Sequence, residues 1–351
     1  MSPAALPTWT TVTDLPRAHG APLGSGRLRV TPEDFHVTEQ LGFTPDGTGD
    51  HRLLWVRKTG ANTEWVARRL AATAGVPVST VGYAGLKDRW AVTEQWFSLP
   101  APQREAAEPD WSTLTDAGIE VLAVHAHRRK LKRGTLTGNH FHITIRDWHG
   151  DPAALTARLD AIRAHGVPNY FGEQRFGHAD SNLHHAHAFL TGAIKRPPPH
   201  QRGLWISAAR SQLFNELLAE RVRRGDWKHL QPGDCAQLAG RQSFFCTEDI
   251  DATLNERVAH WDLHPTGPLW GRGTLPTRQA IQTLEQQTAA HFAPWPERLA
   301  EFGLEHERRA LRLRVEQLEA ECSEERLTLH FALTAGSYAT SVLRELLTAH
   351  E

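Results

Sequence analysis

The sequence is organised around residues 82–97, which read GYAGLKDRWAVTEQWF. On either side of the charged centre of this stretch, residues 79–84 and 91–99 carry the β-branched and aromatic residues typical of short strands. Gly85 opens the connection between them and tolerates backbone angles that other residues avoid. The pattern therefore predicts two strands joined by a tight turn.

The turn holds one acidic residue between two basic ones, because Lys87, Asp88 and Arg89 are consecutive. Opposite charges within a few ångströms favour an ionised carboxylate, so Asp88 is suited to act as a nucleophile rather than as an acid. The alternative is a solvated turn whose ion pairs contribute at most about 1 kcal/mol. Charge pattern alone favours that alternative.

The sequence of the whole stretch is similar to the motif of a known family. Residues 84–95, AGLKDRWAVTEQ, resemble the A-G-x-K-D-R/K-x-A-x-T-x-Q motif of the TruD family of tRNA pseudouridine synthases. Further matching pieces run from PEDF at 32–35 to AGSYATSVLREL at 335–346, so the resemblance covers nearly the entire chain. It implies that Asp88 is the catalytic residue.

The resemblance also implies a substrate site. The family's phenylalanine in PEDF corresponds to Phe35, its G-N-x-F motif to Asn139 and Phe141, and a C-terminal substrate-contacting phenylalanine to Tyr338. An amide for the base edge and rings for its faces suit a uracil pocket. Arg29 is a weaker candidate for a nearby basic contact. From pattern alone, Phe35 and Phe141 are more typical of core residues.

Two further arginines are assigned by the resemblance. Arg344, in ATSVLREL, is expected to pair with Asp88, and the alternative is a surface salt bridge with Glu345 or Glu351. Arg175, in NYFGEQRFG at 169–177, is expected either to contact phosphate or to brace the wall of the active site.

The formal net charge of the whole chain is only −1, but basic residues cluster locally. Of the 39 basic residues, 33 are arginines. The most basic segment is HRRKLKR at 127–133. Such a segment attracts an RNA backbone, with an affinity that falls steeply with salt, although a solvated loop has the same pattern. The expected RNA contacts are Lys87, Arg89, Arg128, Arg129, Lys130, Lys132, Arg133 and Arg175.

The three cysteines, Cys235, Cys246 and Cys322, are odd in number and lack CxxC spacing, which suggests neither a disulfide framework nor a zinc site. The histidines of NLHHAHAFL (182–190) have no HExxH motif or acidic ligand set, so we expect surface or packing residues and no metal. No apolar run reaches the roughly 18 residues of a membrane span, and no signal pattern opens the chain. We expect a cytoplasmic monomer.

The expected fold is α/β (α+β). A catalytic domain with a mixed, largely antiparallel sheet, built from residues 1–164 and 306–351, would carry the pseudouridine-synthase core, and 165–305 would form the TRUD insertion domain. Clear strands are predicted at 139–148 and, as an antiparallel pair, at 311–316 and 327–333. Asp151, Pro152 and Gly166 bracket a predicted helix.

The implied reaction isomerises uridine to pseudouridine in tRNA, at position 13 of the D arm by family analogy. It needs no outside atoms, hence no cofactor, and the target nucleotide must be flipped out of its stack. Two alternatives remain from the residues: an RNA-binding or RNA-folding protein without catalysis, and metal-dependent hydrolysis through the histidine-rich helix.

Overall fold

Two compact units make up the part of the chain that the computed structural model describes, residues 6–102 and 107–350. One, here called the sheet unit, comprises Pro22–Arg163, Val315–Ala339 and the chain from Leu346 onward. The other, the helical unit, comprises the chain up to Ala21, Ala164–Arg314 and Thr340–Glu345.

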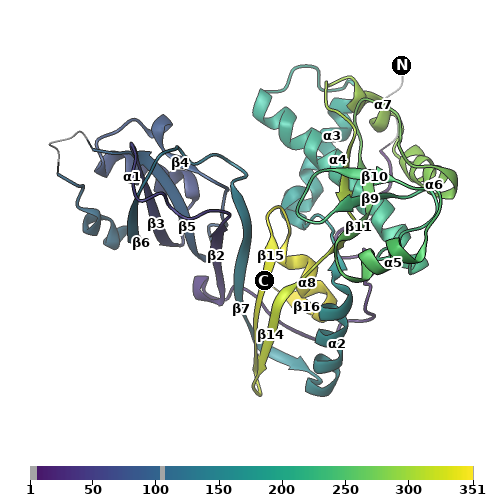
Figure 1. The fold of residues 1–351 in the computed structure, drawn as a ribbon, viewed down its shortest axis with the longest axis horizontal. Helices are drawn as coiled ribbons and strands as arrows, with labels where there is room; N and C mark the ends of the chain where they lie inside the picture. Colours follow the sequence, from purple (N-terminus) through teal and green to yellow (C-terminus); the bar gives the residue numbers. More distant parts are fainter. Residues whose placement is uncertain (1–5, 103–106, 351) are drawn as a thin grey trace. The chain divides into compact units, whose positions relative to one another are not determined.

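The sheet unit is built on one ten-stranded sheet (Figure 1). Its main path runs β14-β15-β7-β2-β5-β3-β6, with β1, β16 and β4 attached at the side. Only the β1–β16 and β2–β5 pairs are parallel, so the mixed, largely antiparallel sheet is confirmed. The strands are β1 (Gly24–Arg27), β2 (Phe35–Leu41), β3 (His51–Thr59), β4 (Gly82–Tyr83), β5 (Val92–Pro100), β6 (Ile119–His127), β7 (Leu136–Gly150), β14 (Glu316–Cys322), β15 (Arg326–Thr334) and β16 (Thr348–His350).

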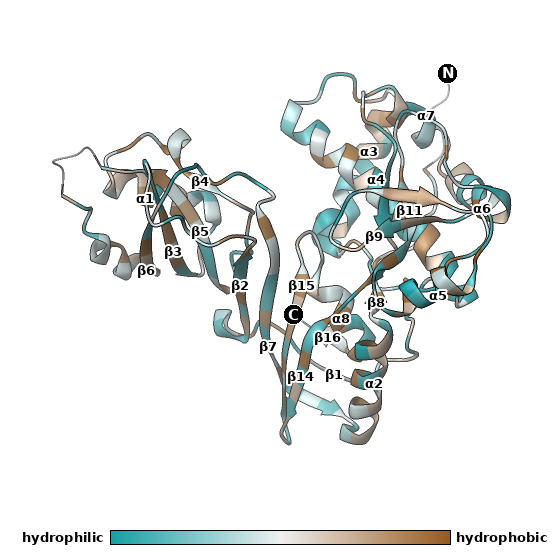
Figure 2. Ribbon diagram, viewed as in Figure 1, coloured by the Kyte–Doolittle hydropathy of each residue, from teal (hydrophilic) through white to brown (hydrophobic). Residues whose placement is uncertain are grey.

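Helix α1 (Thr63–Thr73) packs its apolar stripe on this sheet, and α2 (Pro152–His165) follows β7. The core beneath α1 joins Val66 and Leu70 to Leu54 and Phe97 of the strands, all fully buried. Hydrophobic residues are accordingly concentrated on β3, β5 and β6 (Figure 2). This core fixes the base from which the turn after β4 projects.

The helical unit combines helices with a four-stranded sheet ordered β10-β9-β11-β12 and a β13–β8 pair. Its long helix α4 is tied to β9 by a fully buried ion pair, Arg221–Asp234, at 2.9 Å. The elements are α3 (Ser181–Leu190), α4 (Pro199–Arg224), α5 (Ala252–Ala259), α6 (Gln279–Ala290), α7 (Trp295–Ala300), α8 (Ala339–Leu346), β8 (Val167–Pro168), β9 (Cys235–Leu238), β10 (Phe244–Cys246), β11 (Leu263–Leu269), β12 (Glu307–Ala310) and β13 (Arg312–Leu313).

The units differ from the predicted domains at the chain ends. Residues 306–314 fall in the helical unit because β12 pairs with β11 and β13 pairs with β8. The N-terminal segment joins the same unit, where the backbone N–H groups of Ala18 and His19 donate to the carboxylate of Glu345 at 3.2 and 3.0 Å. The predicted antiparallel pairing of 311–316 with 327–333 is wrong for the same reason, since β13 within this stretch pairs with β8 and the partner of β15 begins only at Glu316.

Cysteine pairing also differs from the prediction. Cys235 and Cys246 stand opposite each other in the antiparallel β9–β10 pair and form a disulfide. Strand register, rather than a short spacing in the sequence, brings the two thiols together.

The histidines of α3 pack on tryptophans. The His185 ring stacks on Trp205 with centroids 5.1 Å apart, and His187 accepts a hydrogen bond from the Trp295 indole at 3.3 Å. Across residues 6–102 and 107–350, no three His, Cys, Asp or Glu side chains are arranged to hold a metal ion. Over the same residues, no helix combines the length and the hydropathy that a membrane crossing requires.

Candidate active site

Asp88 lies in the connection between β4 and β5, whose backbone is fixed from two sides. The Lys58 ammonium, at the end of β3, donates to the carbonyl oxygen of Asp88 at 2.8 Å. The backbone N–H of Lys87 donates to the Thr63 hydroxyl, at the start of α1, at 3.0 Å. The Asp88 side chain is still 35% exposed. The main chain is therefore anchored while the carboxylate stays open to a ligand.

Arg29 supplies the positive charge beside this carboxylate. Its Nη2 lies 3.2 Å from Asp88 Oδ2, and its guanidinium carbon lies 4.4 Å from the centroid of the Phe35 ring. Its carbonyl accepts the indole N–H of Trp90 at 2.8 Å. Arg29 has φ 55°, a left-handed backbone that costs a non-glycine residue about 1–3 kcal/mol. These contacts on both its backbone and its side chain offset that cost.

Within the sheet unit Asp88 is paired with Arg29, whereas Arg344, expected as its partner, belongs to the other unit. Arg344 is in the helical unit, where its guanidinium donates to the carbonyls of Val12 at 3.3 Å, Leu15 at 2.5 Å and Pro16 at 3.1 Å. Burial lowers its pKa, while Glu345 opposes that shift. Arg344 therefore holds the N-terminal segment against α8 through these hydrogen bonds.

The predicted aromatic residues form a buried row rather than an open platform. Phe35 is 3% exposed and Phe141 is 8% exposed, with their rings edge to face at 6.3 Å. Phe141 in turn stacks on Phe331 of β15, with centroids 5.2 Å apart. Phe35 is thus linked to Asp88 through Arg29, and Phe141 packs against Phe35.

A chain of buried charges runs beneath the turn. Lys87 Nζ lies 3.1 Å from Glu39 Oε1 and also donates to the Asn139 side-chain oxygen. Burial raises the pKa of Glu39, which Lys87 opposes. Burial also lowers the pKa of Lys58 to about 8, with Asp88 and Glu39 acting in the other direction. Asn139, predicted to face a uracil, is therefore held in place by the residue that precedes Asp88.

Comparison with known proteins shows the family of this chain. The model of a family described as tRNA pseudouridine synthase D (TruD) matches residues 18–191 and 181–346. The chain belongs to the TruD family. Relatives named tRNA pseudouridine synthase D include that of Methylococcus capsulatus, 49% identical over 95% of this chain and 94% of the relative, and that of Nitrosococcus oceani, 46% identical over 94% and 92%.

A solved structure shares the fold. The crystal structure titled as the putative tRNA pseudouridine synthase D of Methanosarcina mazei has a TM-score of 0.74 to this chain at 21% identity, covering 94% of this chain and 95% of that one. The predicted fold class, α/β (α+β) with a mixed, largely antiparallel sheet, is confirmed.

The remaining TruD motif residues are placed as follows. Tyr338 is half-buried in the segment that links β15 to α8. Arg89 is exposed and donates to the carbonyl of Gly60 at 3.4 Å. Arg175 lies in the helical unit, donates to the Ser207 hydroxyl at 2.8 Å and lies over the ring of Phe171.

The basic segment forms an exposed surface in the sheet unit. Arg128, Arg129, Lys130, Lys132 and Arg133 are all exposed, and the first four line a cavity of about 640 Å³. The same cavity is lined by a ring pair, Phe43 stacked on His127 with centroids 5.0 Å apart. Cations beside a stacked aromatic pair suit a nucleic-acid backbone and its bases.

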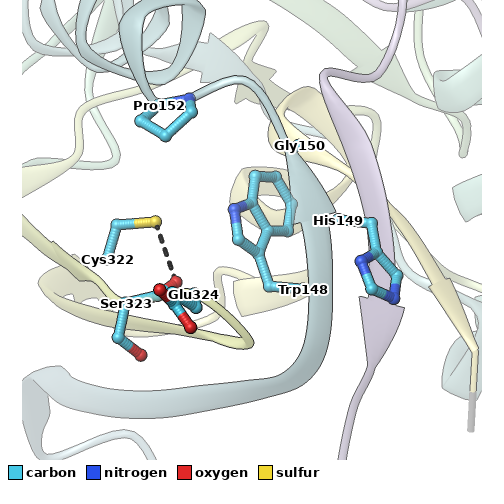
Figure 3. Close-up of a pocket in the computed structure, with 7 residues that line it drawn as sticks. All are labelled: Trp148, His149, Gly150, Pro152, Cys322, Ser323 and Glu324. Atoms are coloured by element: carbon cyan, nitrogen blue, oxygen red, sulfur yellow. Dashed lines mark hydrogen bonds between the residues drawn. The ribbon is translucent and has the colours of Figure 1, made fainter.

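Another cavity, of about 630 Å³, shares no residue with the Asp88 site (Figure 3). The thiol of Cys322 and the indole of Trp148 face each other across it, whereas His149 points away (Figure 3). The cavity therefore contains no cysteine–histidine pair of the kind that nucleophilic thiols use.

Sequence reasoning missed several residues around Asp88. Lys58 and Glu39 are buried charges, and Leu86 and Trp90 are exposed apolar side chains, at 59% and 53%. The signal for Trp90 was available, because a tryptophan directly after a charged turn has little core to enter. Nothing in the sequence marks Lys58 or Glu39 as buried.

Proposed function

We propose that this protein is a tRNA pseudouridine synthase that converts uridine to pseudouridine at position 13 of tRNA, with Asp88 as its catalytic carboxylate. The observation that carries the proposal is the geometry of Asp88: a backbone held by Lys58, a partly exposed carboxylate, and Arg29 at 3.2 Å. Family membership and relatives named as this enzyme support the same conclusion.

The reaction breaks the bond between N1 of uracil and C1′ of ribose, turns the base, and joins C5 to C1′. As C5 bonds to C1′ it gives up its proton, and N1 takes one up, so the product has the same composition as the substrate and the protein supplies position, charge and proton transfer. Asp88 provides the carboxylate that opens the reaction, and Arg29 balances its charge. The flipped-out uridine would meet the Asn139 amide and the Tyr338 ring, and the buried rings of Phe35 and Phe141 would form the wall behind this pocket.

Exposed cations would hold the rest of the tRNA. The surface at 128–133 carries five of them in the sheet unit, and the affinity for tRNA should fall steeply as salt is raised. We place this activity in the cytoplasm, with the protein acting as a monomer on tRNA.

The test is the Asp88→Asn variant, assayed with an unmodified tRNA transcript. We expect pseudouridine formation to disappear while tRNA binding stays within about threefold of wild type, because the variant keeps the shape of the side chain and loses its charge. Asp147→Asn, an exposed carboxylate paired with Arg27 on the sheet unit, is the matched control and should retain activity. Pseudouridine formation by Asp88→Asn refutes the assignment. A wild-type protein that binds tRNA without modifying it supports the RNA-binding alternative instead.

A further inference from the structure

The helical unit contains a cavity of about 450 Å³ against the first half of α4. Arg202, Gly203, Ile206, Ser207 and Arg210 line it from the helix, at spacings that place them on one face. Its volume lies within the range of about 300–1,000 Å³ that is usual for ligand pockets.

The charge of this cavity is one-sided. Arg202, Arg210 and Arg309 line it, and no residue of its lining is Asp or Glu. Arg210 is held in place by the carbonyls of Leu269 and Glu305, each at 2.9 Å, and by an ion pair with the Glu307 carboxylate at 3.2 Å. Arg309 donates to the Asn169 side-chain oxygen at 2.7 Å. Two of the guanidinium groups are therefore positioned in advance, which suits the recognition of an anion.

The same cavity has flat apolar walls. Phe171 and Phe302 line it, and the Arg309 guanidinium carbon lies 4.2 Å from the centroid of the Phe171 ring. Phe302 is itself stacked on Phe189, with centroids 4.9 Å apart. Fixed cations beside aromatic walls match a ligand that carries a phosphate and a planar base.

We propose that this cavity binds a nucleotide of the tRNA other than the uridine that reacts, with its phosphate on the arginines and its base against the apolar wall. The proposal rests on the proposed function, because it takes tRNA as the ligand. It assigns to the helical unit, which does not contain Asp88, a direct part in selecting the substrate.

Gly203 allows the cavity to be filled without strain. A Cβ atom added there meets no atom within 4 Å, so a larger side chain can start from this position. Gly203→Trp should occupy the cavity and weaken tRNA binding by about 10-fold or more, since a base–aromatic contact and a phosphate contact are lost together. Gly203→Ala is the matched control: it favours the helix and leaves the cavity open, so it should bind as wild type does.

A second pair of variants tests the charge. Arg202→Ala should weaken binding and reduce the slope of log affinity against log salt by about one, because one phosphate contact disappears. Arg241→Ala removes the same charge from an exposed turn of the same unit, away from the cavity, and should leave the slope unchanged. The melting temperature of each variant verifies folding.

Pseudouridine formation separates this inference from the proposed function. Gly203→Trp should raise KM and keep kcat at saturating tRNA. If wild type forms pseudouridine and Gly203→Trp and Arg202→Ala bind tRNA as their controls do, the inference is overturned and the proposed function stands. If wild type forms none, the proposed function fails, while selective loss of tRNA binding in these two variants would still support the cavity as a nucleotide site.

Discussion

The burial of Lys58 beneath the Asp88 turn can be tested by measuring protein stability as a function of pH. Its side chain is fully buried, and burial lowers its pKa from 10.5 to about 8. Between these two pH values the unfolded chain holds a proton that the folded chain has released, so the free energy of unfolding should rise with pH across this window. A shift of about 2.5 units, at about 1.4 kcal/mol per unit, corresponds to about 3 kcal/mol.

The Lys58→Met variant removes this contribution and keeps the length of the side chain. We would measure urea unfolding of both proteins by tryptophan fluorescence from pH 7 to 10.5 and compare their free energies of unfolding. The wild-type value should gain about 3 kcal/mol relative to the variant between pH 8 and 10.5. Lys130→Met, at an exposed lysine that donates to the Ser79 carbonyl, should show no such gain. Parallel profiles for wild type and Lys58→Met would refute the buried, shifted amine.

Other side chains near Asp88 give separate expectations. Trp90→Ala should weaken tRNA binding about 5- to 150-fold, the range for loss of one base–aromatic stack, because Trp90 is 53% exposed and its ring is open to a base. Trp65→Ala, at an exposed ring of α1, should leave binding unaltered. Phe141→Ala should lower the free energy of unfolding by about 3–5 kcal/mol in urea, and a loss below about 1 kcal/mol would contradict its place in the buried row. Arg29→Ala should slow pseudouridine formation at saturating tRNA by about 100-fold, with Arg29→Lys recovering part of the rate; an Arg29→Ala variant as fast as wild type would argue against the ion pair.

Much of the secondary structure could be predicted, because it depends on local patterns. Period-two alternation over 139–148 corresponds to β7, and the Asp151 carboxylate accepts a bond from the N–H of Ala153 at the start of α2. The start of α4 is harder to predict, since residues 195–202, KRPPPHQR, have the composition of a stiff loop and yet Pro199 occupies the first helical position. The pairing of residues 311–316 was wrong because alternation indicates a strand without naming its partner.

Predicting the residues around Asp88 from the sequence is limited in the same way, because local patterns do not identify contacts between distant residues. A motif could single out Asp88, but which of 33 arginines stands beside it depends on the fold. Arg29 reaches the carboxylate from a backbone conformation that no sequence pattern announces. Lys58 and Glu39 read as ordinary strand charges, and only the packing of β2, β3 and β5 shows that water cannot reach them.

The buried charges beneath Asp88 fix the position of the turn that carries it. Removing Glu39 and Lys87 from water is costly, and it is offset because they lie 3.1 Å apart and because Glu39 also accepts the backbone N–H of Trp96 at 2.9 Å. Displacing the turn would separate this pair, leaving each charge buried and unpaired, and would also break the bond from Lys58 to Asp88. The arrangement therefore favours one backbone conformation of the turn that carries Asp88. The carboxylate is already oriented when the substrate binds, so the active site needs little reorganisation during the chemical step.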